Sequence, residues 1–265
     1  RRRLSFGLTP CPNDTYFAGA VALGRVALAD ADLAITLEDI EALNEAALAR
    51  RYDIVKVSCA LFGALRDDYE LLDVGAAVAE DYGPLILTRV PMQPAALAHA
   101  RLVGPGPHTT GAALCRLYAP TAHLAARRYD DIMPSLVRGE FDAGVVIHEG
   151  RLTYAAQGLH CLVDLGAWWR ETTGLPVALG CYVMKRDLYA TYGRAFEALM
   201  RASLAVAAAG TDAELKAYIR HHAQEMDETV LRDYIGLYVN ARTHTLGPSG
   251  RAAVVALGER LQAVA

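Results

Sequence analysis

The sequence lacks the features of membrane and exported proteins. Its 265 residues contain no apolar segment long enough to cross a bilayer. The longest stretch without Asp, Glu, Lys or Arg runs from Leu102 to Cys115, and two prolines and three glycines interrupt it. Residues 1–7 lead straight into a strand-like run, with no apolar signal segment. We therefore expect a cytoplasmic protein without a membrane partner.

Neither sign of charge is in large excess. The chain has 26 Lys and Arg against 30 Asp and Glu, a formal net charge of −4, and neither sign forms a long block. A protein that binds nucleic acid needs a concentrated basic surface. We therefore expect no nucleic-acid partner. Monomer and homodimer both fit the sequence.

Motifs for metals, nucleotides and nucleophilic serine are missing. The five cysteines are widely spaced and form no Cys-x-x-Cys pair, which argues against a disulfide framework and a zinc site. There is no His-Glu-x-x-His, no Gly-x-Gly-x-x-Gly and no Gly-x-Ser-x-Gly. We therefore expect no metal, and the sequence excludes the commonest dinucleotide-binding and serine-hydrolase patterns.

Short apolar runs alternate with segments of helical periodicity over the first two thirds of the chain. This pattern predicts βαβ units, an α/β fold and largely parallel strand pairing. We predict strands over Leu4–Leu8, Leu33–Leu37, Asp53–Val57, Leu71–Val74, Leu85–Thr88, Arg101–Gly104, His123–Tyr129, Ala143–His148, His160–Asp164 and Ala178–Lys185.

The last third of the chain is helical in character. Asp212 and Asp227 are suited to cap two of its helices. These helices cannot bury their apolar stripes on one another alone, so we expect them to wrap a sheet built earlier in the chain. The predicted helices are Tyr189–Ala209, Asp212–Gln224, Asp227–Asn240 and Ser249–Ala263.

Two segments rich in proline and glycine, Gly83–Pro94 and Thr173–Pro176, suggest crossings between lobes. If both are crossings, residues 1–90 and 178–265 form one discontinuous lobe and residues 91–177 form the other. A ligand site then lies in the cleft between the lobes.

The segment Thr9–Thr15 connects a predicted strand to a predicted helix. Two prolines stiffen it, and Asn13 or Asp14 can cap the helix, so that backbone N–H groups point above the strand end. The segment is either a tight, well-capped turn or part of a binding site.

Two adjacent hydroxyls, Thr109 and Thr110, stand before Gly111 at the start of another predicted helix. Hydroxyl and amide donors at the positive end of a helix dipole suit a carboxylate. A simple N-cap role for Thr109 fits the sequence equally well.

Lys56 and Ser58 flank Val57 where a predicted strand ends, the edge at which ligands bind in parallel sheets. A lysine there is either a ligand contact or a surface side chain that extends into solvent.

His148 follows a run of small and apolar residues and precedes Glu149 and Arg151. The pattern places an imidazole at a strand tip, and imidazole is the side chain suited to proton transfer near neutral pH. A single histidine of this kind is more often structural than catalytic. Trp168, Trp169 and Tyr154 could stack on an aromatic ligand, but core packing is the more common use of such residues.

Taken in order, these segments resemble the 1,4-dihydroxy-6-naphthoate synthases of the futalosine route to menaquinone. The resemblance covers nearly the whole chain. It is carried by residues 8–15, 37–44, 56–58, 108–110, 147–149, 153–154, 163–169, 173–176 and 238–241. One departure is Gly150, where the family's His-Glu-Ser-Arg run has serine.

The resemblance implies a two-lobed fold like class II periplasmic binding proteins, with mixed sheets flanked by helices and a helical C-terminal third. It also implies a lyase that needs no cofactor and converts cyclic dehypoxanthine futalosine, a small anionic substrate, to 1,4-dihydroxy-6-naphthoate. His148 matches the proton acceptor, and residues 56–58 (Lys56, Val57, Ser58) with Thr109 and Thr110 match substrate-binding segments. We add Asn13 and Asp14 as candidate substrate contacts.

Two other functions fit the same sequence. The first is the chorismate dehydratase of the same pathway, which shares the expected fold and setting. The second is a solute-binding protein that binds its ligand without converting it.

Overall fold

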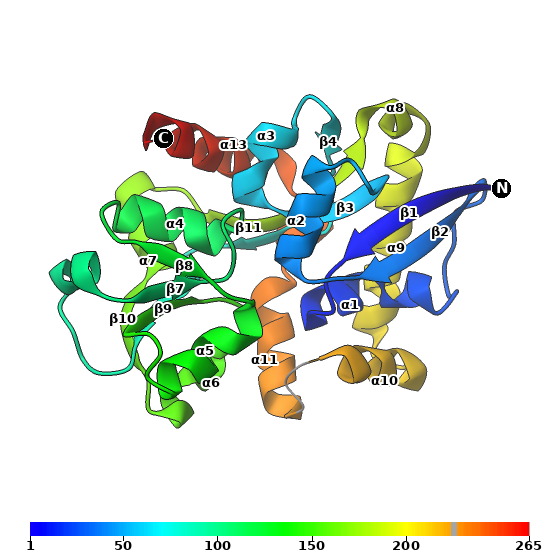
Figure 1. The fold of residues 1–265 in the computed structure, drawn as a ribbon. Coiled ribbons are helices and arrows are strands. Elements are labelled where there is room, and N and C mark those ends of the chain that lie inside the picture. Colours follow the sequence, from blue (N-terminus) through cyan, green and yellow to red (C-terminus); the bar gives the residue numbers. More distant parts are fainter. Residues whose placement is uncertain (224–226, 265) are drawn as a thin grey trace.

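The computed structural model describes residues 1–223 and 227–264, and two mixed β-sheets organise them (Figure 1). The first sheet has the order β2-β1-β3-β11-β4, with β5 paired to β11. The second has the order β10-β6-β9-β7-β8. The first sheet contains β1 (Arg2–Leu8), β2 (Ala31–Leu37), β3 (Ile54–Ser58), β4 (Tyr69–Leu71), β5 (Ala77–Ala79) and β11 (Val177–Lys185). The second contains β6 (Leu85–Thr88), β7 (Leu102–Gly104), β8 (Leu124–Ala126), β9 (Ala143–Val146) and β10 (His160–Asp164).

Strand pairing is parallel in one part of each sheet and antiparallel in the other. β1 is parallel to β2 and β3, and β7 is parallel to β8 and β9. β11 runs antiparallel to its neighbours β3, β4 and β5, and β6 runs antiparallel to β9 and β10. The expectation of largely parallel pairing is therefore wrong. The strand that follows each crossing, β6 after the first and β11 after the second, runs opposite to its neighbours in the sheet that it joins. The expected mixed sheets and α/β class are confirmed.

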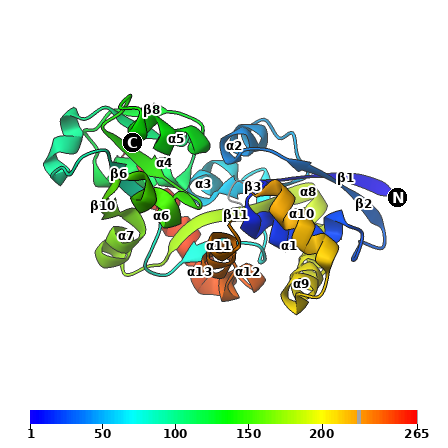
Figure 2. The same cartoon turned by 90° about the horizontal axis from the view of Figure 1, so that it is seen from below.

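The helices lie against the sheets and between them (Figures 1 and 2). The first sheet carries α1 (Pro12–Ala22), α2 (Ile40–Leu48) and α3 (Phe62–Leu65), the last preceded by a 3₁₀ turn at Cys59–Leu61. The second carries α4 (Thr110–Tyr118), α5 (Tyr129–Val137), α6 (Gly150–Thr153) and α7 (Leu165–Thr173), with 3₁₀ turns at Pro94–His99 and Tyr154–Gln157. We call residues 1–79 and 177–264 the first half, and residues 85–173 the second half.

The C-terminal helices cover the first half, as expected. α9, α10 and α11 pack on α1, whereas α13 packs on α3 and β11. Asp212 and Asp227 cap α10 and α11 through their carboxylates, which confirms that prediction. Gln224, the predicted end of one helix, lies outside the described residues. The elements are α8 (Arg186–Leu188), a π-helical turn (Tyr189–Gly193), α9 (Arg194–Ala209), α10 (Ala213–His222), α11 (Glu228–Tyr238), α12 (Ala241–His244) and α13 (Gly247–Val264).

The first crossing between the halves comes earlier than the predicted break after residue 90. β6 already pairs with β9 and β10, so the chain leaves the first sheet over residues 80–84. This segment rests on the start of α7, where a Cβ on Gly166 would lie 2.1 Å from the carbonyl carbon of Tyr82. Only glycine permits so close an approach of two backbones. The return crossing ends where β11 begins at Val177, next to the predicted position.

One hydrophobic core runs through both halves. It contains Val55 of β3 and Val183 of β11 together with Ile86, Val145 and Trp169 of the second half. Burial of such side chains stabilises the fold by roughly 1.5–3 kcal/mol each. The two halves are therefore joined by apolar packing as well as by the two crossings.

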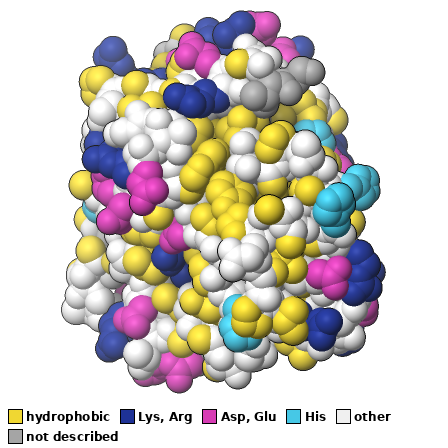
Figure 3. All heavy atoms as spheres, turned by 90° about the vertical axis from the view of Figure 1, so that its left-hand side faces the viewer, with side chains coloured by type: hydrophobic (Ala, Val, Ile, Leu, Met, Phe, Trp, Pro, Cys, Tyr) yellow, Lys and Arg dark blue, Asp and Glu magenta, His cyan; other side chains and the backbone are white. Residues whose placement is uncertain are grey.

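The outer face of the second half carries a band of hydrophobic side chains, with acidic and basic groups mixed around it (Figure 3). Within the part of the chain that the structure describes, no helix has the length and apolar character needed to cross a membrane.

Candidate active site

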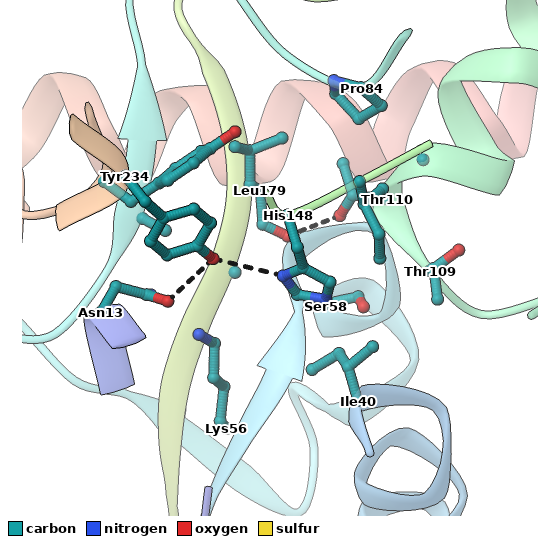
Figure 4. Close-up of a pocket in the computed structure, with 15 residues that line it drawn as sticks. Asn13, Ile40, Lys56, Ser58, Pro84, Thr109, Thr110, His148, Leu179 and Tyr234 are labelled. Carbon is teal, nitrogen blue, oxygen red and sulfur yellow. Dashed lines mark hydrogen bonds between the residues drawn. The ribbon is translucent and has the colours of Figure 1, made fainter. Parts of the chain in front are cut away.

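A small cavity lies where the two halves meet α11, and its volume is about 80 Å³. The first turn of α1, the start of α2, the end of β3 and the middle of β11 contribute its first-half wall. The start of α4 and the residues after β9 contribute the opposite wall (Figure 4). The lining residues are Asn13, Ile40, Lys56, Ser58, Ala77, Pro84, Thr109, Thr110, Gly111, Ile147, His148, Leu179, Gly180, Tyr234 and Tyr238.

A buried ion pair underlies the first-half wall. Lys56 Nζ donates to both carboxylate oxygens of Asp14, at 2.6 and 2.5 Å, and the two side chains are only 7% and 1% exposed. Tyr182 donates to the same carboxylate at 2.8 Å, and Thr9 also donates to it. We call these four residues the polar floor. The Asp14 carboxylate thus accepts four hydrogen bonds from these three neighbours, which compensate the burial of its charge.

His148 projects from the second half, two residues beyond the end of β9. Its backbone has φ +60°, a left-handed conformation that is uncommon outside glycine and that asparagine, aspartate and histidine adopt more often than other residues. Burial, with a smaller effect of the Lys56 charge, lowers the pKa of the imidazole from 6.5 to about 3. The ring is therefore neutral at physiological pH and holds one nitrogen with a free lone pair.

In the part of the chain that the structure describes, three side chains make aromatic or polar contacts with this ring. Tyr129 meets it edge to face with ring centres 4.6 Å apart, and the Tyr234 hydroxyl lies 3.3 Å from Nδ1. Cys11 Sγ lies 3.4 Å from Nδ1, and burial raises the pKa of this thiol to about 12. Cys11 is therefore a neutral thiol and not a nucleophilic thiolate.

Both predicted threonine hydroxyls already have backbone partners. Thr109 is the N-cap of α4: its hydroxyl accepts from Ala112 N–H and donates to Gly106 O. The Thr110 hydroxyl donates to Leu179 O at 2.7 Å and accepts from Ala60 N–H, so it ties α4 to the first half. The N-cap role that the sequence left open for Thr109 is the one observed.

Ser58 and Lys56 each have a hydrogen-bond donor left for a ligand in the cavity. The Ser58 hydroxyl accepts from Asn44 Nδ2 at 3.0 Å, which leaves its own proton for another acceptor. An ammonium group has three N–H bonds, and Asp14 provides two acceptors for that of Lys56. One wall can therefore offer a hydroxyl and a positive charge to an anionic ligand.

The structure brings six of the predicted site residues to one cavity and leaves two outside it. Asn13, Lys56, Ser58, Thr109, Thr110 and His148 line it. The Val57 side chain points into the core, and Asp14 lies beneath the wall in the polar floor. Neither Asn13 nor Asp14 caps α1: the helix begins earlier, at Pro12, because proline is well suited to the first helical position.

Sequence reasoning missed the two tyrosines of α11 that line the cavity. Tyr234 and Tyr238 are four residues apart, and their ring centres are 4.7 Å apart. This spacing puts them on one face of a helix, which was the available signal. By contrast, Trp169 lies in the core, with its indole N–H donating to Pro176 O, and neither Trp168 nor Trp169 lines the cavity.

Gly150 is explained by packing. A Cβ at this position would lie 2.3 Å from Cγ1 of Val146 and 3.1 Å from Sδ of Met133. The space that a serine side chain would use is thus filled in this chain. Among residues 1–223 and 227–264, no three His, Cys, Asp or Glu side chains are grouped so that they could hold a metal ion.

Comparison with solved structures defines the class of protein. The alkanesulfonate-binding protein SsuA of Xanthomonas axonopodis, bound to MOPS, has a TM-score of 0.71 at 14% identity, and covers 100% of this chain and 93% of its own. The periplasmic aliphatic sulphonate binding protein SsuA of Escherichia coli has a TM-score of 0.66 at 14% identity, over 100% and 86%. The chain thus has the fold of periplasmic binding proteins, with its cavity between the two halves.

Sequence comparison narrows this class to one family. The family model described as menaquinone biosynthesis matches residues 4–263. A 1,4-dihydroxy-6-naphthoate synthase of Thermus thermophilus is 42% identical over 254 residues, 96% of this chain and 92% of the relative. The synthase of the same name from Streptomyces coelicolor is 40% identical over 98% of this chain and 93% of its own. A solved structure from Archaeoglobus fulgidus, 31% identical, has a TM-score of 0.92 over 98% and 97%. The chain belongs to the menaquinone biosynthesis family, which confirms the resemblance seen in its sequence.

Proposed function

We propose that this protein is a lyase that converts cyclic dehypoxanthine futalosine to 1,4-dihydroxy-6-naphthoate, without a cofactor. The observation that carries the proposal is that a neutral imidazole and the start of a helix open onto one cavity, in a chain 42% identical to a protein named as this synthase. The reaction releases the sugar-derived fragment and makes a ring aromatic. It therefore needs a proton removed from carbon, which a neutral imidazole can accept.

In this proposal the substrate carboxylate binds at the start of α4. The first N–H groups of a helix have no intrahelical acceptor, and Thr109 satisfies those of Ala112 and Ala113. The N–H groups of Thr110 and Gly111 are then the donors that α4 offers, at the positive end of its dipole. Thr109 and Thr110 grip the carboxylate mainly through this helix start, because their hydroxyls are held by backbone groups.

The first-half wall binds the other end of the substrate. Ser58 offers a hydroxyl proton and Lys56 a positive charge to oxygens of the sugar-derived part. His148 then faces the fused rings between these two polar ends and acts as the general base. The walls exclude water and keep the imidazole neutral.

Substrate binding requires the walls to move. The cavity of about 80 Å³ is smaller than the roughly 300–1,000 Å³ of ordinary ligand pockets. We therefore take the described arrangement as closed, and expect the two halves to separate before the substrate can enter and to close around it afterwards.

Product formation tests the activity. Purified protein is incubated separately with cyclic dehypoxanthine futalosine and with chorismate, and the products are identified by absorbance and mass spectrometry. We expect 1,4-dihydroxy-6-naphthoate from the first and no reaction with the second, before and after dialysis against a chelator. Consumption of chorismate alone would identify the dehydratase instead, and tight binding without conversion would identify a solute-binding protein.

The variant His148→Asn tests the base. Asparagine tolerates the left-handed backbone at this position, so the variant is expected to fold, while turnover falls by about 100-fold or more. An active, folded His148→Asn protein would show that the imidazole is not the general base. We also propose that the enzyme acts in the cytoplasm, which fractionation of cells producing the native protein would check.

A further inference from the structure

The environment of His148 settles which of its ring nitrogens carries the proton. A neutral imidazole has one N–H and one bare nitrogen, and only its partners distinguish the two. Here Nδ1 faces the Tyr234 hydroxyl at 3.3 Å, while in the described part of the chain the nearest partner of Nε2 is Cys11 Sγ at 3.8 Å. The direction of the Tyr234 contact therefore decides the tautomer.

The hydroxyl proton of Tyr234 is already used in a hydrogen bond. Its hydroxyl donates to Asn13 Oδ1 at 3.1 Å, from the first turn of α1 (Figure 4). Burial raises the pKa of Tyr234 well above its ordinary value, so the phenol keeps that proton. Towards His148 the Tyr234 oxygen can then only accept, and Nδ1 must be the donor.

The polar floor fixes the orientation of Asn13. Its Nδ2 faces Asp14 Oδ1 at 3.4 Å, and Lys56 and Tyr182 hold that carboxylate in place. Turning the amide round would bring its carbonyl oxygen against the carboxylate and its NH₂ against the Tyr234 oxygen. The first contact would be repulsive, so Asn13 keeps its carbonyl towards Tyr234.

Among the described residues, Cys11 is the competing partner of Nδ1, and its contact is weak. Cys11 Sγ lies 3.4 Å from Nδ1, and an S–H donor aimed at that nitrogen would favour the opposite tautomer. A neutral thiol is a poorer donor and acceptor than a phenol oxygen. The Tyr234 contact therefore outweighs it.

We propose that Tyr234 and Asn13 are positioning residues that hold the proton of His148 on Nδ1 and so present Nε2 as the basic nitrogen. The series runs from Asp14 through the Asn13 amide and the Tyr234 hydroxyl to the ring, and each member sets the direction of the next hydrogen bond. Its catalytic consequence rests on the proposed function, but the tautomer itself does not.

The tautomer can be read by NMR of protein labelled with ¹⁵N-histidine, through long-range correlations between the ring nitrogens and ring protons. In the wild type we expect Nδ1 to be protonated and Nε2 bare. In Asn13→Ala the Tyr234 proton is released and can turn to Nδ1, so we expect the opposite tautomer. In Tyr234→Phe only the weak Cys11 contact remains at Nδ1, so we expect a mixture of the two tautomers.

Kinetics give a second readout. We expect both variants to lower kcat by about 10-fold or more with little change in KM, because loss of the group that sets a catalytic tautomer costs up to about 10⁴-fold in serine proteases. Tyr69→Phe is the matched control: it removes another buried tyrosine hydroxyl, bound to Tyr52 O at 2.9 Å and outside the cavity. It should change neither the tautomer nor kcat.

The possible outcomes separate the two proposals. A wild-type spectrum with Nε2 protonated, or the same tautomer in all variants, would overturn the positioning role even if naphthoate forms. The expected spectra in a protein that forms no naphthoate would support the positioning role and reject the proposed function. The wild-type spectrum is informative even if a variant does not fold.

Discussion

The two walls of the cavity are built in different ways. The first-half wall stands on the polar floor, where Asp14 and Lys56 are almost fully buried and bound to each other. The second-half wall presents His148 from a left-handed residue beyond a strand end, with polar contacts of 3.3 and 3.4 Å at Nδ1. One wall is thus held by short charged contacts, whereas the other carries a loosely bonded group. The fixed wall therefore supplies, through Asn13 and Tyr234, the hydrogen bonds that orient the reactive group of the other.

The largest effect on stability is expected from a substitution that breaks the polar floor. Asp14→Asn removes the partner of the Lys56 ammonium and leaves that charge buried, which should lower the free energy of unfolding by about 3–5 kcal/mol. Denaturant unfolding measures this loss. Asp68→Asn, in the exposed pair with Arg50, is the control and should cost about 0–1 kcal/mol. Equal losses of unfolding free energy for the two variants would mean that the polar floor stabilises the fold no more than an exposed ion pair does.

The second prediction concerns the pH dependence of the opposite wall. The pKa of His148 is lowered from 6.5 to about 3, so the folded protein binds fewer protons than the unfolded chain between these pH values. The stability that His148 contributes is therefore complete above about pH 6.5 and is lost as the pH falls towards 3.

Unfolding curves between about pH 7 and pH 4 test this prediction. His148→Asn should lose less stability than the wild type over that range. His160→Asn, which changes an exposed histidine, should behave like the wild type. Identical curves for His148→Asn and the wild type would show that the ring titrates as it does in water.

A smaller effect is expected at the start of α4. Thr109→Ala removes the N-cap hydroxyl and should cost about 1 kcal/mol of stability. A less ordered helix start should also raise KM by about 5-fold, if the substrate carboxylate binds there. Thr109→Ser keeps the hydroxyl and should restore both values. An unchanged KM in a destabilised Thr109→Ala protein would show that the substrate carboxylate binds at another place.

The smallest effect is expected where the two halves touch beside the cavity. Glu41 of α2 accepts from the backbone N–H of His108, at 3.3 Å, and contacts its ring Nδ1 at 2.5 Å. Glu41→Gln should weaken the closed arrangement by about 0.5–1 kcal/mol and raise KM a few fold with kcat unchanged. A fall in kcat alone would give Glu41 a role in catalysis and not in closure.

Local patterns were sufficient where the signal lay within a short segment. The caps at Asp212 and Asp227 and the helical last third follow from side-chain chemistry over a few residues. The start of α1 was not predicted correctly from the sequence. The helix begins at Pro12, because proline suits the first helical position, so neither Asn13 nor Asp14 is its N-cap. The short strand β5, Ala77–Ala79, was not predicted, since three small residues become a strand only by pairing with β11.

The sequence by itself determined the family, the α/β class and the residue types that carry the chemistry, because these depend on the order of short motifs along the chain. Only the tertiary structure decided which of them meet. It buried Asp14 beneath the wall, turned Val57 into the core and brought Tyr234, 221 residues after Asn13, between that residue and His148. Hydrogen-bond direction and burial depend on neighbours from distant segments, and no local pattern contains them.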